Sequence, residues 1–156
     1  MSRDFLVSWE TLHRDARALA WRLLETGRWE RIVAVTRGGL VPATIVAREL
    51  GVRLIDTVCI RSYDHRDQGS ITVLKGAAAH QGDTLVVDDL ADTGATLRVV
   101  RQLLPEATIA TVYVKPAGRD VVDVHVTEVG QETWIHFPWD LDLRYAPPAH
   151  QGRDGD

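Results

Sequence analysis

Residues 85–97, with the sequence LVVDDLADTGATL, combine an apolar run, two adjacent carboxylates and a turn rich in Asp, Thr and Gly. The apolar run predicts a buried strand, and the turn after it predicts the start of a helix. Backbone N–H groups of residues 93–96 would then converge at a helix N-terminus beside two hydroxyl groups, an arrangement that binds phosphate. Asp88 and Asp89 would repel a bare phosphate, so we expect them to face sugar hydroxyls or a hydrated Mg²⁺. The segment therefore predicts a site for a sugar phosphate.

Strand-like and helical segments alternate on both sides of this motif. Short β-branched runs predict strands at 32–36, 54–60, 71–75, 84–89 and 108–115. Helical spacing and stop signals predict helices from Ser8 to Gly27, from about Pro42 to Gly51, and between Thr96 and Pro105. Several of the strand-like runs are apolar at consecutive positions, which is typical of parallel strands covered by helices. We therefore predict an α/β fold with a central, mainly parallel sheet flanked by helices.

Composition predicts one domain in a reducing compartment. The 156 residues carry a formal net charge of −4 and a pI near 5.8, which argues against a large basic surface for duplex nucleic acid. The single Cys59 excludes an intramolecular disulfide framework, and we expect it to be a small buried hydrophobe. Apolar runs are too short for a membrane span, and charges near the N-terminus exclude a secretory signal. We expect one cytoplasmic domain over 1–156, with Trp9 and Trp21 in the packing of the first helix and a disordered tail at 148–156.

The motif at 85–97 resembles the phosphoribosyl pyrophosphate (PRPP) signature of the type I phosphoribosyltransferases. Further segments resemble the bacterial xanthine-guanine phosphoribosyltransferases, namely TRGGLVPA (36–43), ARELG (47–51), DTVCI (56–60), SYDH (62–65), VLK (73–75), KPAGR (115–119) and TWIHFPWD (133–140). This resemblance covers nearly all of residues 6–148. It implies the type I phosphoribosyltransferase fold, with a flexible flap within 61–75 and a small C-terminal hood that recognises the base.

The resemblance also implies an activity. An enzyme of this kind is a pentosyltransferase of purine salvage: with Mg²⁺ it transfers 5-phosphoribose from PRPP to N9 of a 6-oxopurine and releases pyrophosphate. Guanine and xanthine are the implied substrates, with hypoxanthine weaker, and the products are GMP, XMP and IMP. The residues themselves do not distinguish among the three bases. A homotetramer, an association with the periphery of the inner membrane and the absence of a nucleic-acid partner are implied in the same way.

The resemblance assigns residues to each part of this site. The PRPP- and phosphate-binding residues that it implies are Arg37, Gly38, Asp88, Asp89, Thr93, Gly94, Ala95, Thr96 and, in the flap, Arg66, with Asp89 as the metal contact. The purine-binding residues that it implies are Asp92, Lys115, Trp134 and Ile135, with Asp92 as the catalytic proton relay at N7 of the base. The loop at 37–38 is implied to carry a strained non-proline peptide that exposes N–H groups to pyrophosphate.

The sequence departs from the family at two positions. Ala95 stands where the family usually has glycine, and a positive φ there would cost an alanine about 1 kcal/mol. Gly69 stands where a related enzyme has a basic residue, so we expect Arg61 or Arg66, and of the two Arg66, to contact pyrophosphate.

Two other classes of protein use similar residues. PRPP-binding folds also occur as ligand-sensing regulators of nucleic acids, but these need a basic face or an added DNA-binding domain, and neither is visible in this sequence. Phospho-receiver domains also combine an acidic pair, a Thr and a Lys-Pro after parallel strands. In receivers the acidic pair follows the first strand, whereas the pair and Asp92 here share one loop late in the chain. The order of the motifs excludes a receiver.

Overall fold

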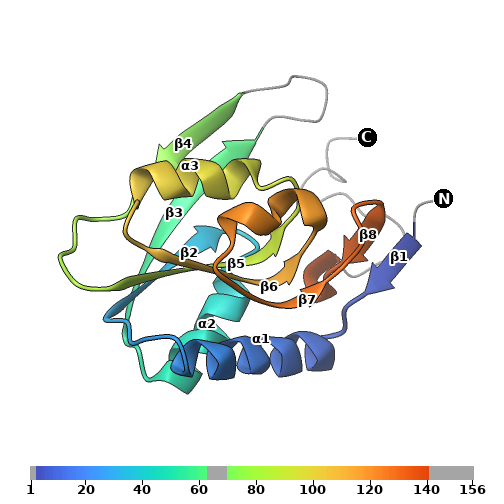
Figure 1. Cartoon of the computed structure of the whole chain (residues 1–156), viewed down its shortest axis with the longest axis horizontal. Helices are drawn as coiled ribbons and strands as arrows, with labels where there is room; N and C mark the ends of the chain where they lie inside the picture. Colours follow the sequence, from blue (N-terminus) through green and yellow to red (C-terminus); the bar gives the residue numbers. More distant parts are fainter. Residues whose placement is uncertain (1–2, 63–69, 141–156) are drawn as a thin grey trace, which may run out of the picture.

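The computed structural model describes residues 3–62 and 70–140, and a six-stranded sheet in the order β4-β3-β2-β5-β6-β7 lies at its centre (Figure 1). The strands are β2 (Arg31–Thr36), β3 (Leu54–Ser62), β4 (Ile71–Lys75), β5 (Thr84–Ala91), β6 (Thr108–Val114) and β7 (Val124–Glu128). All neighbouring pairs are parallel except β3 and β4. The predicted mainly parallel sheet is confirmed.

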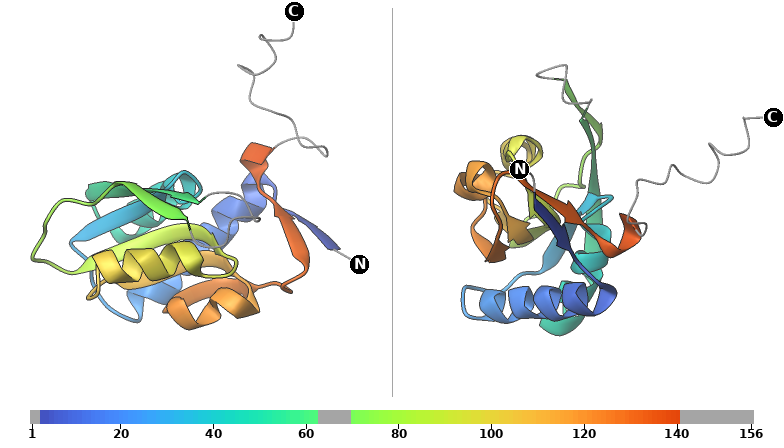
Figure 2. Two further views of the ribbon diagram at one scale, coloured as in Figure 1. Left: turned by 90° about the horizontal axis from the view of Figure 1, so that it is seen from above. Right: turned by 90° about the vertical axis from the view of Figure 1, so that its right-hand side faces the viewer.

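Helices cover both faces of this sheet. The helices α1 (Trp9–Leu24) and α2 (Leu40–Leu50) pack on one face, and α3 (Ala95–Leu103) with the 3-10 helix η1 (Pro116–Val121) packs on the other (Figures 1 and 2). Alternate residues of β2 and β5 enter the two cores, with Ile32 and Leu85 in one and Val33 and Val86 in the other. The consecutive apolar residues of these strands are therefore explained by burial on both faces.

Local signals set the ends of the helices. The Ser8 hydroxyl accepts a hydrogen bond from the Thr11 N–H at 3.1 Å and caps α1. Gly51 ends α2 with a φ of 69°, which a glycine adopts without the steric penalty of a Cβ atom. None of the helices in the described part of the chain is long and apolar enough to cross a membrane.

A second, small sheet joins the two ends of the described chain. Its strands are β1 (Arg3–Leu6) and β8 (Thr133–His136), which pair in parallel, and a 3-10 helix, η2 (Pro138–Asp140), follows β8. We call this sheet the hood (Figure 2). Neither β1 nor β7 is among the strands that the sequence predicts, because four or five residues of mixed polarity carry too little pattern.

Three expectations about burial are wrong. Trp9 and Trp21 are exposed to 50% and 61% rather than packed, because both lie on the outer side of α1. The Trp21 indole N–H donates to Glu49 at 3.4 Å, and Trp9 contacts the ring of Trp139 edge-on. Cys59 is only half-buried, because β3 lies next to the edge of the sheet. The tips of the predicted flap and tail, residues 63–69 and 148–156, lie outside the described residues.

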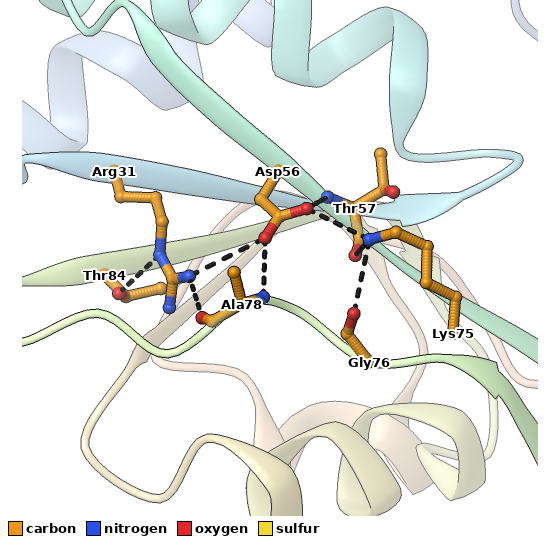
Figure 3. A network of polar contacts seen from close by, with 7 residues as sticks. All are labelled: Arg31, Asp56, Thr57, Lys75, Gly76, Ala78 and Thr84. Carbon is orange, nitrogen blue, oxygen red and sulfur yellow. Dashed lines mark hydrogen bonds and ion pairs between the residues drawn. The ribbon is translucent and has the colours of Figure 1, made fainter.

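A closed polar network lies near the amino ends of the parallel strands, and we call it the anchor network (Figure 3). It consists of Arg31, Asp56, Thr57, Lys75, Gly76, Ala78 and Thr84. The Arg31 guanidinium, almost fully buried, donates to the Thr84 hydroxyl at 3.2 Å and to the Ala78 carbonyl. Asp56 accepts from the Ala78 N–H at 2.7 Å and from Lys75 at 3.0 Å. These contacts attach the connection between β4 and β5 to the sheet.

Candidate active site

The candidate site lies at the carboxyl ends of the parallel strands. β2 and β5 are neighbours, but the chain continues from β2 to β3 on one side and from β5 to β6 on the other. Open α/β sheets bind ligands at such a reversal of strand order, because the two connections leave a crevice between them. Asp89, near the end of β5, and Gly38, in the turn after β2, meet at this point.

Residues 93–96 form the turn that opens α3, and we call them the cradle. Gly94 is the N-cap of α3 with a φ of 86°, and Ala95 is the first helical residue. Among the described residues no amino acid other than glycine has a positive φ, so Ala95 takes an ordinary helical conformation. A pocket of about 120 Å³ opens here, lined by Asp88, Leu90, Ala91, Asp92, Thr93, Gly94, Ala95, Thr96 and Leu97. The methyl group of Ala95 is therefore accommodated without the strain that a positive φ would impose.

Arg98 supports the cradle from behind. Its guanidinium donates to the carbonyl of Thr93 at 2.8 Å and to that of Ala117 at 3.1 Å. It also pairs with Asp120 at 2.8 Å. The arginine thus joins the cradle to η1, and sequence reasoning missed it because it belongs to no motif.

Asp88 and Asp89, the acidic pair, are held close to each other without a cation. Asp88 is buried, and its Oδ1 accepts the Asp89 N–H at 2.8 Å. Burial raises the pKa of Asp88 well above its ordinary value, and the adjacent charge of Asp89 raises it further. Burial also raises the pKa of Asp89, whose Oδ1 accepts the Leu90 N–H at 2.7 Å. Within the described part of the chain no cation lowers either pKa, so the pair favours a cation or hydroxyl donors from a ligand.

The turn after β2 brings backbone against the acidic pair. A Cβ atom on Gly38 would lie 2.2 Å from Oδ2 of Asp89, and one on Gly39 would lie 2.5 Å from the Val87 carbonyl oxygen. A larger residue at Gly39 would therefore collide with backbone, and one at Gly38 would displace the Asp89 carboxylate. The Thr36–Arg37 peptide is cis, which agrees with the unusual backbone that the resemblance implies for this turn. Arg37 itself is exposed.

Asp92 and Lys115 meet at the other side of the pocket. Lys115 follows β6, and its side chain is almost fully buried. The ammonium donates to Oδ2 of Asp92 at 3.2 Å. Gln131, which sequence reasoning missed, donates to Oδ1 of the same carboxylate at 2.8 Å. The structure therefore brings together a buried cation and a half-exposed carboxylate next to the cradle.

The hood carries the two remaining predicted residues. Trp134 is 61% exposed and lies beside Asp4, whereas Ile135 is buried beside Phe5. Residues on adjacent positions of a strand point to opposite faces, so Ile135 holds the hood on the core while Trp134 presents its ring outward. Arg66 lies outside the described residues, and Arg61 is exposed at the end of β3.

The acidic pair fits a magnesium ion that arrives with a phosphorylated ligand. The described residues contain no group of three or more His, Cys, Asp or Glu side chains that could hold a metal. Mg²⁺ keeps several waters and is commonly bound through one or two carboxylates together with substrate phosphates. Two adjacent carboxylates with raised pKa values beside an anion-binding cradle match that pattern.

Residues 6–146 match the family model of the phosphoribosyl transferase domain. The chain belongs to the phosphoribosyltransferase family. A purine phosphoribosyltransferase from Pyrococcus horikoshii is 28% identical and superposes with a TM-score of 0.80, over 92% of this chain and 99% of the other. A Helicobacter pylori xanthine-guanine-hypoxanthine phosphoribosyltransferase is 25% identical with a TM-score of 0.73, over 90% and 96% of the two chains. The predicted type I phosphoribosyltransferase fold is confirmed.

A third structure is similar over a smaller part of its length. A hypoxanthine-guanine phosphoribosyltransferase from Bacillus anthracis is 25% identical to this phosphoribosyltransferase, with a TM-score of 0.64, and the match covers 83% of this chain and 84% of the other. The first of these proteins is named for purines in general, the second for xanthine, guanine and hypoxanthine, and the third for hypoxanthine and guanine. Similarity at this level therefore does not select one base.

Proposed function

We propose that this phosphoribosyltransferase transfers 5-phosphoribose from PRPP to N9 of a 6-oxopurine and releases pyrophosphate. One observation carries the proposal: the acidic pair, which has no cation partner among the described residues, precedes the cradle, with three residues between them, at the point where the strand order reverses. A sugar phosphate matches both parts: its hydroxyls would donate to the carboxylates of the acidic pair, and its phosphate would accept from the N–H groups of the cradle. The names of the similar structures support a purine as the second substrate.

The first half of the site would bind PRPP. The N–H groups of Thr93, Gly94, Ala95 and Thr96 would hold the 5′-phosphate at the N-terminus of α3, where the helix dipole favours an anion. Asp88 and Asp89 would accept hydrogen bonds from the ribose hydroxyls. The pyrophosphate would lie over Arg37 and Gly38. Because Gly38 has no side chain, the ligand could approach the backbone there. We include Arg66 in this half as the flap cation.

A magnesium ion, when bound with PRPP, would neutralise part of the diphosphate charge and so make it a better leaving group. Asp89 is the residue that we assign to it, directly or through water. Its carboxylate lies against Gly38, and therefore against the turn that we assign to the pyrophosphate.

The second half would bind the base. The Lys115 ammonium has only donors, so it would bind a 6-oxo oxygen and leave the amino group of adenine without a partner. Trp134 would stack on the ring, and the backbone of Ile135 would contact the 2-position. We propose guanine and xanthine as the preferred bases and hypoxanthine as a weaker one.

The chemistry would depend on position and charge rather than on a covalent intermediate. As the bond from the anomeric carbon to the pyrophosphate breaks, positive charge develops on the ribose, and N9 of the base attacks from the opposite side. Asp92, already an acceptor for two donors, would take or share the proton at N7 as N9 becomes nucleophilic. Proton transfer of this kind usually accelerates a reaction by about 10²- to 10⁴-fold.

Pyrophosphate release tests the proposal. The purified protein is incubated with PRPP and Mg²⁺, and with xanthine, guanine, hypoxanthine or adenine in separate reactions, with EDTA as a control. We expect release with 6-oxopurines, loss of release in EDTA, and rejection of adenine by about 10⁴-fold. Measurable PRPP binding without release from any base would overturn the proposal and favour the ligand-sensing regulator.

The homotetramer and the cytoplasmic location belong to the same proposal. Four apolar residues on or near the edge of the central sheet are exposed and support a contact between subunits, namely Leu54, Ile55, Val73 and Leu74. The mass of the protein in solution, from light scattering, tests the tetramer. Flotation with vesicles of anionic lipid tests the association with the membrane periphery.

A further inference from the structure

Gln131 lies in the turn between β7 and β8 and connects two parts of the candidate site. Its Nε2 donates to Oδ1 of Asp92 at 2.8 Å, and its Oε1 accepts from the backbone N–H of Ala117 at 2.9 Å. The partners set the orientation of the amide, because an N–H group can only donate and an ionised carboxylate can only accept. A side chain with one donor end and one acceptor end is therefore required to satisfy both neighbours.

The contact with Asp92 completes a two-sided grip on that carboxylate. Gln131 holds Oδ1 from the hood side, and Lys115 holds Oδ2 from β6 at 3.2 Å. Two donors on the two oxygens determine the plane of the carboxylate, which a single donor does not. The Asp92 side chain is still 51% exposed, so it remains open on the side of the pocket. The two hydrogen bonds thus orient the carboxylate and leave it accessible from the pocket.

The contact with Ala117 is a separate, structural one. Ala117 lies in η1 two residues after Lys115, and its carbonyl accepts from Arg98 at 3.1 Å. The Lys115 N–H donates in turn to the carbonyl of Ala91 at 2.9 Å. Gln131 therefore touches η1 and Asp92 at once, and a test has to separate these two contacts.

We propose that Gln131 is a positioning residue, which holds the Asp92 carboxylate in the orientation that accepts the proton at N7 of the purine. This inference rests on the proposed transfer to a 6-oxopurine. Without the Gln131 donor, the carboxylate turns toward Lys115, its remaining partner. Both groups that contact the base are then misaligned, while the cradle keeps its own hydrogen bonds. Gln131 therefore affects the use of the base and leaves PRPP binding unchanged.

Two substitutions of similar length separate the two contacts. Gln131→Glu keeps an acceptor for the Ala117 N–H but places a second carboxylate against Asp92. Gln131→Met keeps the length and removes both contacts. If Gln131 served only to hold η1, Gln131→Glu would be nearly as active as the wild type and Gln131→Met the poorer enzyme. If it positions Asp92, Gln131→Glu is the poorer one. Gln102→Glu, on the exposed side of α3, makes the same change of charge away from the site.

Steady-state kinetics with guanine and PRPP give the first readout. We expect kcat to fall about 100-fold in Gln131→Glu and about 10-fold in Gln131→Met, because misplacing a reacting group by about 1 Å can cost about 10²-fold. The KM for PRPP should stay within about twofold of the wild type, as should every constant of Gln102→Glu. A Gln131→Glu enzyme with wild-type kcat, or one with kcat intact and a raised KM for PRPP, would overturn the inference.

A second readout does not depend on activity. In ¹⁵N-labelled protein without ligands, the side-chain amide resonances of Gln131, assigned by their loss in Gln131→Met, should shift in Asp92→Asn and stay in place in Asp83→Asn. Absence of a shift in Asp92→Asn would show that the contact does not form. If the wild type releases no pyrophosphate but the amide shifts, the proposed function fails and the contact itself stands.

Discussion

The anchor network and the acidic pair lie toward opposite ends of the parallel strands, and the pKa values of their carboxylates shift in opposite directions. Asp56 in the anchor network receives N–H groups from Ala78 and Thr57 and the ammonium of Lys75, and these lower its pKa to about 2 (Figure 3). Asp88 and Asp89 accept hydrogen bonds from backbone N–H groups and from each other but from no cation among the described residues, and burial raises their pKa values. The protein supplies the donors at the amino end. At the carboxyl end the described residues supply fewer donors and no cation.

This difference separates a structural carboxylate from a binding one. A carboxylate surrounded by protein donors stabilises the fold, because its ionised form is more favourable in the folded state than in the unfolded one. A buried carboxylate next to another one destabilises the fold and is retained only if a bound ligand compensates for it. Substitutions in the two regions should therefore change different quantities.

The largest effect is expected from Asp89→Asn. The amide keeps an acceptor for the Leu90 N–H but removes the negative charge, so pyrophosphate release should fall by about 10²- to 10³-fold. The melting temperature of the ligand-free protein should rise, because one of two adjacent buried charges is gone. The two assays are read against Asp83→Asn, an exposed aspartate just before β5. A lower melting temperature would place Asp89 among the structural carboxylates.

Asp56→Asn should have the opposite effect: it should lower the stability of the protein and leave its activity nearly unchanged. It leaves the almost fully buried Arg31 guanidinium without its carboxylate, and breaking a buried pair costs about 3 kcal/mol of the free energy of unfolding. Urea denaturation measures this loss. The kcat of the remaining folded enzyme should stay within about twofold of the wild type, since the anchor network is far from the carboxyl ends of the strands. A loss of kcat without a loss of stability would remove the distinction between the two regions.

The pH dependence of stability sharpens the same comparison. The folded-state pKa of Asp56, about 2, is below its ordinary value of 3.8, so Asp56 contributes stability above about pH 4. That contribution, about 2 kcal/mol, is lost as pH falls from about 4 to about 2. The difference in urea midpoint between the wild type and Asp56→Asn should shrink over this range. A difference that stays constant down to pH 2 would show that Asp56 keeps no depressed pKa in the folded protein.

The smallest effect is expected where the candidate site contributes backbone alone. Ala95→Gly should lower the free energy of unfolding by about 0.5 kcal/mol, because glycine is the poorer residue in a helix. The affinity for PRPP, measured by calorimetry, should not change, since the Ala95 conformation does not need a glycine. A clear gain in affinity would mean that the methyl group of Ala95 obstructs the phosphate. Gly94→Ala, at a φ of 86°, provides the contrasting variant and should lose affinity.

Much of this molecule follows from local patterns. The strands at 32–36, 84–89 and 108–115 could be predicted because consecutive apolar residues have few alternatives to a buried strand. The strands at 54–60 and 71–75 are largely exposed or half-buried and could be predicted from their β-branched residues alone. The cradle could be predicted because Asp, Thr and Gly specify a turn at one short stretch of chain. The contact between Asp92 and Lys115 was not predicted, although parallel strands do end at the same edge of a sheet.

Other features depend on contacts between distant parts of the chain. β1 is a strand only because β8 lies beside it, and Trp21 is exposed because none of the described elements covers that side of α1. Gln131 carries no motif, and its role arises from the folding of three separate segments around it. The low pKa of Asp56 likewise depends on Ala78 and Lys75, which lie about twenty residues away in the chain.

The sequence by itself determined the strand pattern, the anion-binding turn and the acidic pair, because each is encoded by residues that are neighbours in the chain. The tertiary structure decided how many protein donors surround each carboxylate. Asp56 and Asp89 are both aspartates in β-strands, and the sequence does not show how many donors the fold places around each. The number of donors around each carboxylate depends on what the fold packs against it. Several donors lower the pKa of Asp56, whereas burial with fewer donors raises the pKa of Asp89.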